Sequence, residues 1–260
     1  MYLMEHSGEG QRMEDRDLEE AVQHLTLAGL RAGDRALDAG CASGWLTRLM
    51  AGMAMPGEVV GVDQSLERIE MARARAVELQ LTGVRFEQGD LYQLPFQEAA
   101  FDVSFSRYTF EYLQEPARAL REMKRVTRPG GRVVVADLDG NGVFHYPIPA
   151  EVEGILSKLS GALARAGFDP FIGRKLYHLF YQEGFQRIQV HAMPHHLIAG
   201  TATPAQLENW ATKLRTIRPH AIRAFPSEAA YDRFTELSLE LLRRDDVLTY
   251  STTFLVVGVV

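Results

Sequence analysis

The chain has 260 residues, of which 46% are hydrophobic, and a formal net charge of −6 at pH 7. This composition predicts a globular protein with a sizeable core and excludes the basic balance that nonspecific binding to nucleic acid or an anionic membrane requires. The one cysteine, Cys41, excludes an internal disulfide. Because residues 1–10 also lack a basic-then-apolar signal pattern, we expect a cytoplasmic protein.

Strands alternate with helices through the first half of the chain. A polar, glycine-containing arm precedes a helix over residues 18–30, where apolar residues recur at helical spacing. Helices are predicted at residues 45–53, after a cap at Ser65, and from Pro116 to a Pro-Gly-Gly stop at residues 129–131. The predicted strands lie at residues 35–38, 59–62, 84–88, 101–106 and 132–136. This order indicates a doubly wound α/β fold with a mostly parallel sheet.

The order of elements changes after Asp137. We expect a loop at residues 140–149, which carries His145, and then helices at 151–166 and 175–183. A strand at 187–191, helices at 204–216 and 227–243, and a final strand at 252–259 follow. The helices between the last two strands are an insertion into the minimal sheet. Ligands of open α/β sheets bind outside the carboxyl ends of the strands, so we expect this insertion to cover the ligand.

The segment between the first two strands has the features of a nucleoside site. Gly40 lets the backbone approach a ligand, and the N–H groups at the start of the helix at Trp45 favour a negative partial charge. Asp63, at the end of the second strand, can accept hydrogen bonds from both hydroxyls of a ribose. Asp90, after the third strand, can accept one from an exocyclic amine such as that of adenine.

Two other nucleotide sites fit this turn less well. The dinucleotide fingerprint requires glycine, and then glycine or alanine, at places where this chain has Ala42 and Trp45. A Walker loop is excluded, because no Gly-Lys-Ser/Thr follows the turn. Alanine tolerates such a turn only if its φ stays negative.

Several motifs in a fixed order resemble those of class I S-adenosylmethionine-dependent methyltransferases. They lie at residues 37–44 (LDAGCASG), 59–65 (VVGVDQS), 86–96, 101–103 and 120–131, and the later ones resemble the branch that includes quinone-biosynthesis C-methyltransferases. A weaker match lies at residues 10–12. The resemblance implies a Rossmann-like sheet of seven strands with the last antiparallel, S-adenosyl-L-methionine as cofactor and S-adenosyl-L-homocysteine as its product.

The resemblance also implies which residues hold the cofactor. The turn faces its amino-acid part, the acids after the second and third strands hold the ribose and the adenine, and the tip of the fourth strand lines the methionine. We expect an arginine of the amino-terminal arm to pair with a carboxylate of the cofactor. The implied residues are Arg12, Asp38, Gly40, Cys41, Ala42, Asp63, Gln64, Gly89, Asp90, Leu91, Ser106 and Arg107.

The methyl acceptor is expected beside His145 and Tyr108, which follow the fifth and fourth strands. An oxygen or nitrogen acceptor can need a general base, and histidine is the usual residue, so His145 is the candidate base. Each residue also has a simpler interpretation, as a hydrogen-bonded loop histidine and a packed aromatic ring. No metal is expected, because His191, His195 and His196 have no paired carboxylate in the sequence.

We divide the chain into an arm and helix that act as a lid (1–34), a cofactor-binding core (35–137) and the remainder of the same domain (138–260). Helices within about 201–247 of that remainder are expected to cover the substrate. A monomer or homodimer is expected, without nucleic acid or membrane as a partner.

The activity predicted from these features is methyl transfer to a small organic molecule in secondary or cofactor metabolism. Aromatic loop residues and covering helices indicate an enclosed, mainly apolar pocket. One alternative is an enzyme that binds the same cofactor but catalyses a rearrangement or cyclisation, and another is a binding module without turnover. A tRNA or protein methyltransferase is disfavoured by the missing basic patch.

Overall fold

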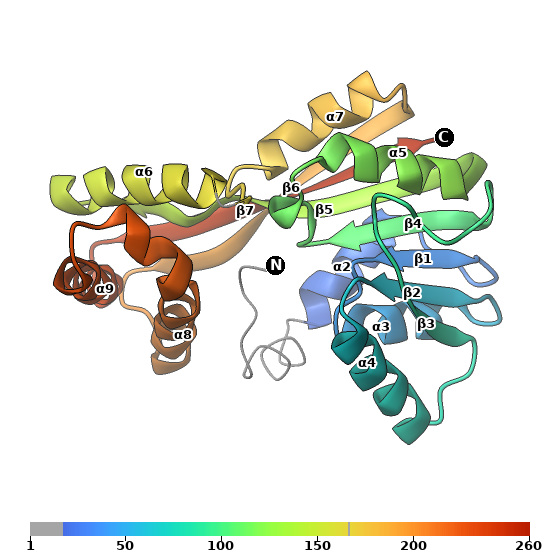
Figure 1. Cartoon of the computed structure of the whole chain (residues 1–260), viewed down its shortest axis with the longest axis horizontal. Coiled ribbons are helices and arrows are strands. Elements are labelled where there is room, and N and C mark those ends of the chain that lie inside the picture. Colours follow the sequence, from blue (N-terminus) through green and yellow to red (C-terminus); the bar gives the residue numbers. More distant parts are fainter. Residues whose placement is uncertain (1–17, 166) are drawn as a thin grey trace.

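Seven strands form one sheet in the computed structural model, which describes residues 18–165 and 167–260 apart from the side chains of 141–143 and 220. Their order is β3-β2-β1-β4-β5-β7-β6, and β7 runs antiparallel to both of its neighbours (Figure 1). The predicted Rossmann-like sheet with an antiparallel last strand is therefore confirmed. The strands are β1 (Ala36–Ala39), β2 (Val59–Asp63), β3 (Val84–Gln88), β4 (Phe101–Arg107), β5 (Thr127–Tyr146), β6 (Gln186–Ala199) and β7 (Leu248–Val259).

Helices cover both faces of the parallel part of the sheet (Figure 1). Every residue of β1 and β2 is buried, because these strands are apolar on both faces. The helices α2 (Leu18–Leu27) and α3 (Trp45–Ala54) pack on one face around Leu25 and Met50. The helices α5 (Pro116–Val126) and α7 (Leu176–Gln182) pack on the other around Leu120 and Phe180. The helix α4 (Leu66–Glu78) lies against β2 and β3.

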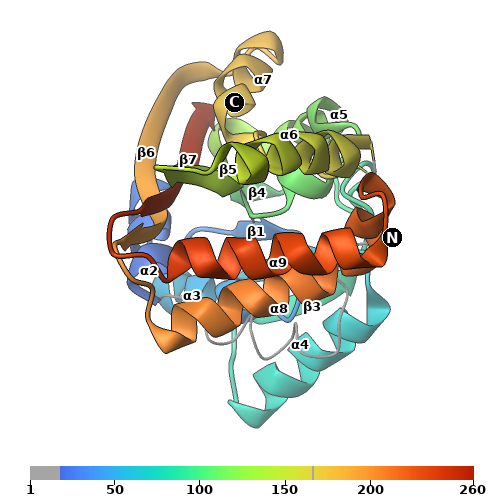
Figure 2. The same ribbon diagram turned by 90° about the vertical axis from the view of Figure 1, so that its left-hand side faces the viewer.

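The strands β5, β7 and β6 continue beyond the parallel strands as an antiparallel ribbon. At its far end lie α6 (Ala150–Arg165), α8 (Pro204–Ala221) and α9 (Glu228–Leu242), and α8 and α9 run side by side (Figures 1 and 2). These three helices share a separate apolar cluster that includes Leu159, Leu214 and Phe234. Short 3-10 helices lie at η1 (Phe110–Tyr112), η2 (Gly173–Lys175) and η3 (Ile222–Ala224).

Two strands of the ribbon, β5 and β6, extend further than the sequence predicted. The expected loop at residues 140–149 is wrong, because β5 continues to Tyr146 after an irregularity in its pairing between Asp139 and Phe144. The glycines at 140 and 142 indicated a loop, but the long β7 offers pairing partners on both sides of the irregularity. Similarly, β6 extends past the predicted end at His191 to Ala199, so His195 and His196 lie within a strand.

The turn after β1 contains a strained alanine. Gly40 and Gly44 have φ values of +86° and +76°, and Ala42 between them has +49°. The condition of a negative φ is therefore not met at Ala42, and its backbone is strained. The backbone N–H of Ala42 donates to Asp63 Oδ2 at 2.9 Å, and this hydrogen bond helps to offset a strain of about 1–2 kcal/mol.

A buried polar cluster joins α2 to the sheet, and we call it the α2 cluster. The Glu20 carboxylate accepts hydrogen bonds from Arg107 Nη2, from the Tyr108 hydroxyl at 2.7 Å and from His195 Nδ1 at 2.9 Å. Arg107 Nε donates to His24 Nδ1 at 3.2 Å. The members of the α2 cluster are Glu20 and His24 of α2, Arg107 and Tyr108 at the end of β4, His195 of β6 and Thr253 of β7.

The charges of the α2 cluster are fixed by burial and by its hydrogen bonds. Burial raises the pKa of Glu20. The hydrogen bond of His195, the charge that its ring carries once protonated at low pH, and the charge of Arg107 outweigh burial and lower that pKa to about 2. Burial and the neighbouring Arg107 charge lower the pKa of His24 to about 4. Glu20 is therefore ionised and His24 neutral at pH 7.

Replacing the strained alanine by glycine is expected to stabilise the protein. Relief of the strain at Ala42 exceeds the extra backbone entropy that glycine loses on folding, so Ala42→Gly should raise the free energy of unfolding by about 0.5–1 kcal/mol. Urea denaturation measures this change. The matched control is Ala74→Gly on the exposed face of α4, which should lower it by about 1 kcal/mol. A loss of stability in both variants would contradict the backbone strain inferred at Ala42.

The pKa of His24 predicts how stability depends on pH. The folded value of about 4 lies below the ordinary value of 6.5, so the unfolded chain binds more protons between these two pH values. Stability therefore falls as the pH drops through this window. The substitution His24→Asn keeps an acceptor for Arg107 and does not titrate, so its unfolding free energy should change less steeply, by about 1 kcal/mol per pH unit. Equal slopes in urea denaturation from pH 6.5 to 4 would rule out this role of His24.

Candidate active site

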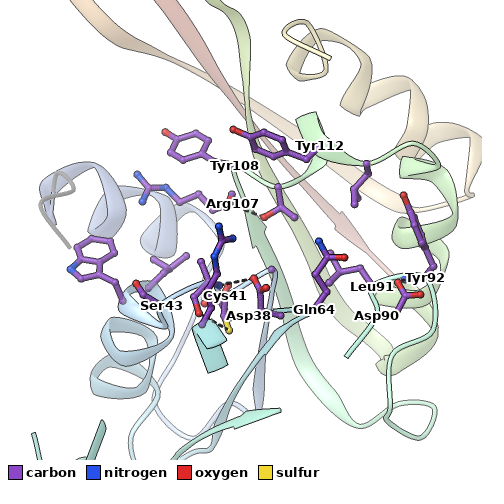
Figure 3. Close-up of a pocket in the computed structure, with 18 of the residues that line it drawn as sticks. Asp38, Cys41, Ser43, Gln64, Asp90, Leu91, Tyr92, Arg107, Tyr108 and Tyr112 are labelled. Atoms are coloured by element: carbon purple, nitrogen blue, oxygen red, sulfur yellow. Dashed lines mark hydrogen bonds between the residues drawn. The ribbon is translucent and has the colours of Figure 1, made fainter. Parts of the chain in front are cut away.

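A cavity of about 270 Å³ opens where the carboxyl ends of β1, β2 and β4 meet. Figure 3 shows its lining, with Asp38, Cys41 and Ser43 on one side and Gln64, Asp90 and Leu91 on the other. The three loops that the sequence predicted to form a nucleoside site are thus brought together. Parallel strands that end at one edge of the sheet explain this convergence.

The turn after β1 forms the floor of the cavity. The N–H groups of Gly40 and Cys41 both donate to the Val62 carbonyl, at 2.8 and 2.9 Å, which ties the turn to β2. A Cβ atom at Gly40 would lie 2.5 Å from Thr109 Oγ1, so only glycine lets these two sides approach. Burial raises the pKa of the Cys41 thiol, which is therefore protonated and fills space in the turn rather than acting as a nucleophile.

Asp63 is held in one orientation by two backbone hydrogen bonds. Its Oδ2 accepts from the Ala42 N–H and its Oδ1 from the Ser65 N–H, each at 2.9 Å. Each carboxylate oxygen can accept a second hydrogen bond. Asp63 lines the cavity, so its two oxygens are placed to receive a pair of neighbouring hydroxyls, as a ribose offers.

The far end of the cavity lies beside β3. Asp90 Oδ1 accepts the backbone N–H of Tyr92 at 2.8 Å, and Leu91 is buried against the core. Asp90, Leu91, Gln64 and Tyr92 all line this end. A carboxylate beside an apolar side chain can bind a flat base with an exocyclic amine, as the sequence predicted for adenine.

The end of β4 and η1 form the wall opposite the turn, with Arg107, Tyr108, Thr109 and Tyr112. The Tyr108 hydroxyl lies in the α2 cluster, where it donates to Glu20 and lies 3.1 Å from Thr253 Oγ1. In Figure 3 this hydroxyl points away from Gln64 and Asp90. Tyr108 therefore lines the cavity, while its hydroxyl belongs to the protein's own network.

Not every predicted site residue lies in the cavity wall. Gly89 packs between Val62 and Pro95, and the Ser106 hydroxyl donates to the Ala39 carbonyl at 2.8 Å. Both therefore support the strands that carry the site. Arg12 lies outside the described residues.

The candidate base His145 is on the ribbon and outside the cavity lining. Its Nδ1 lies 2.8 Å from Thr249 Oγ1, and its ring lies 5.9 Å from that of Trp210 in α8.

Part of the cavity lining was not predicted from the sequence. Trp45 and Leu46 of α3 and Leu113 and Gln114 after η1 face the cavity, and so does Gly167 between α6 and α7. Trp45 and Leu46 directly follow the motif at residues 37–44, so their position in the chain was a usable signal. Gly167 and the contacts of Glu20 depend on long-range packing, for which the sequence has no local signal.

The described residues lack two further features: a cluster of metal ligands and a helix that could span a membrane. Among residues 18–165 and 167–260, no three histidine, cysteine, aspartate or glutamate side chains gather as metal ligands would. In the same part of the chain, no helix combines the length and the apolar character needed to span a membrane.

Comparison with known proteins agrees with this geometry. A family model described as a methyltransferase domain matches residues 30–184. The 27-O-demethylrifamycin SV methyltransferase of Amycolatopsis mediterranei is 38% identical over 146 residues, 54% of this chain and 52% of that protein. A ubiquinone/menaquinone biosynthesis C-methyltransferase of Bdellovibrio bacteriovorus is 33% identical over 142 residues, 53% of this chain and 59% of that protein. The chain spans about half the length of the first curated relatives it matches.

A solved structure shows the same fold. The phosphoethanolamine N-methyltransferase 2 of Haemonchus contortus, in complex with S-adenosyl-L-methionine, superposes with a TM-score of 0.59 at 20% identity. The match covers 93% of this chain and 52% of that one. With a family model across more than half of its residues and this cavity at the strand ends, the chain belongs to the S-adenosyl-L-methionine-dependent methyltransferases.

Proposed function

We propose that the protein transfers a methyl group from S-adenosyl-L-methionine to a small organic acceptor, in a biosynthetic pathway of the cytoplasm. The observation that carries this proposal is a single cavity that joins Asp63 and Asp90 to an aromatic wall at Tyr108 and Tyr112. One end suits a nucleoside, and the other suits a small, partly apolar acceptor. Relatives named for a rifamycin and for quinones support a small molecule.

The residues of the cavity fit the cofactor in three parts. Asp90 and Leu91 would hold the adenine, and Asp63 the two ribose hydroxyls. The turn at Gly40 would receive the methionine part, with Arg107 on the opposite wall. The crowding between Gly40 and Thr109 leaves no room for a side chain at this position, as a close backbone cradle requires.

When bound, the cofactor supplies a methyl group on a positively charged sulfur. The protein's own residues would align the acceptor and exclude water, which suits Tyr112, Leu113 and Leu46 around the cavity.

His145 stays the predicted base for an acceptor that reaches the ribbon. Its substitution His145→Ala should then lower kcat by about 10²–10⁴-fold, and a near-normal kcat would assign it to packing against Trp210.

Asp63 is the residue whose loss should weaken cofactor binding most plainly. In Asp63→Ala the ribose hydroxyls lose their charged acceptor, and we expect affinity for S-adenosyl-L-homocysteine to fall by about 1–3 kcal/mol. Isothermal titration calorimetry measures this change. Asp102→Asn, at a surface ion pair with Arg128 and away from the cavity, is the control and should bind as the unmodified protein does. Equal affinities in both variants would remove Asp63 from the site.

The class of acceptor can be tested without knowing its identity. The protein is incubated with methyl-labelled S-adenosyl-L-methionine and, separately, with the small-molecule, RNA and protein fractions of a cell extract. We expect label in the small-molecule fraction and equimolar S-adenosyl-L-homocysteine, and less of both with Asp63→Ala at a cofactor concentration that does not saturate the variant. Label in RNA or protein would instead favour a macromolecular acceptor. A new small molecule without S-adenosyl-L-homocysteine would indicate a rearrangement or cyclisation.

A further inference from the structure

A buried ion pair lies in the wall of the cavity. The side chain of Arg107 lines the cavity yet is 2% exposed, and that of its partner Glu20 is 16% exposed. Arg107 also donates to the neutral His24, while its Nη1 has no hydrogen-bond partner in the part of the chain described here. A charge in this environment acts more strongly on its neighbours than a charge in water does.

Glu20 and Arg107 carry the two formal charges of the α2 cluster at pH 7. Burial lowers the pKa values of His24 and His195, so both rings are neutral. Burial also raises the pKa of Tyr108, which keeps its proton. Among the described members of the α2 cluster, the negative charge of Glu20 therefore offsets the positive charge of Arg107.

The cofactor and its product differ in charge at one atom. S-adenosyl-L-methionine has a positive sulfonium, S-adenosyl-L-homocysteine has a neutral thioether, and their adenosine and amino-acid parts are the same. A positive wall would therefore repel the methyl donor and leave its product unaffected. Any contact of the wall with the shared carboxylate cancels in a comparison of the two ligands.

We propose that Glu20 sets the preference of the cavity for the cationic methyl donor over its neutral product, by cancelling the charge of Arg107. Glu20 acts through Arg107, so it is a positioning and electrostatic residue and not a catalytic one. The inference rests on the proposed function only in placing the methionine part of the cofactor beside Arg107. It holds for any acceptor.

The test compares binding of two ligands to a set of charge variants. Dissociation constants for S-adenosyl-L-methionine and S-adenosyl-L-homocysteine are measured by calorimetry at pH 7.5. In Glu20→Gln, which leaves the Arg107 charge uncompensated, affinity for the methyl donor should fall relative to the product by about tenfold. The double variant Glu20→Gln/Arg107→Gln removes both charges. It should return the ratio of the two dissociation constants to within about threefold of that of the unmodified protein. A purely structural role of Glu20 would not give this recovery.

Two controls separate charge from packing. Glu19→Gln removes a charge from the exposed neighbour on the same helix, where solvent screens it, and should leave the ratio unchanged. Tyr108→Phe removes a hydrogen bond to Glu20 without a change of charge, so it should shift both affinities by one factor. If Glu20→Gln does not fold, Arg107→Gln alone should move the ratio toward the methyl donor.

Each failure has its own signature. If the unmodified protein binds neither ligand, the proposed placement of the cofactor is wrong. If it binds both, and the ratio stays constant in Glu20→Gln or fails to recover in the double variant, the proposed role of Glu20 is overturned while the proposed function stands.

Discussion

The hydrogen bond from the Ala42 N–H to Asp63 Oδ2 is the interaction on which the site depends. It ties a turn with three positive-φ positions, at residues 40, 42 and 44, to the end of the neighbouring strand. The same bond orients the Asp63 carboxylate, whose second oxygen is held by the Ser65 N–H. One interaction therefore shapes both the backbone cradle and the acid that faces the cavity.

The opposite wall is organised by charge. The end of β4 carries Arg107 and Tyr108, and both turn their polar groups toward Glu20 of α2. The helix α2 is thus fastened to the strand that lines the cavity, and His195 of the ribbon joins the same carboxylate. The cavity wall, α2 and the ribbon are therefore joined by hydrogen bonds to one side chain, that of Glu20.

The sequence predicted the parallel half of the sheet and the site on it, because both have local signals. Short apolar strands, a glycine turn after the first of them, and acids after the second and third are local signals from which the sequence predicted a nucleoside site. The ribbon was missed, because Gly140 and Gly142 indicate a loop by their composition. Only the pairing of β7 with residues on either side of them, at Asp139 and Phe144, carries the strand through this segment. The α2 cluster was missed because Glu20 and His195 lie 175 residues apart and meet through the tertiary fold.

The most direct test of the account is a crystal structure of the protein with S-adenosyl-L-homocysteine bound. The account predicts both ribose hydroxyls within hydrogen-bonding distance of Asp63, the adenine against Leu91, and the sulfur between the turn at Gly40 and the wall at Arg107 and Tyr108. A nucleoside bound elsewhere, or in this cavity with its ribose away from Asp63, would contradict it.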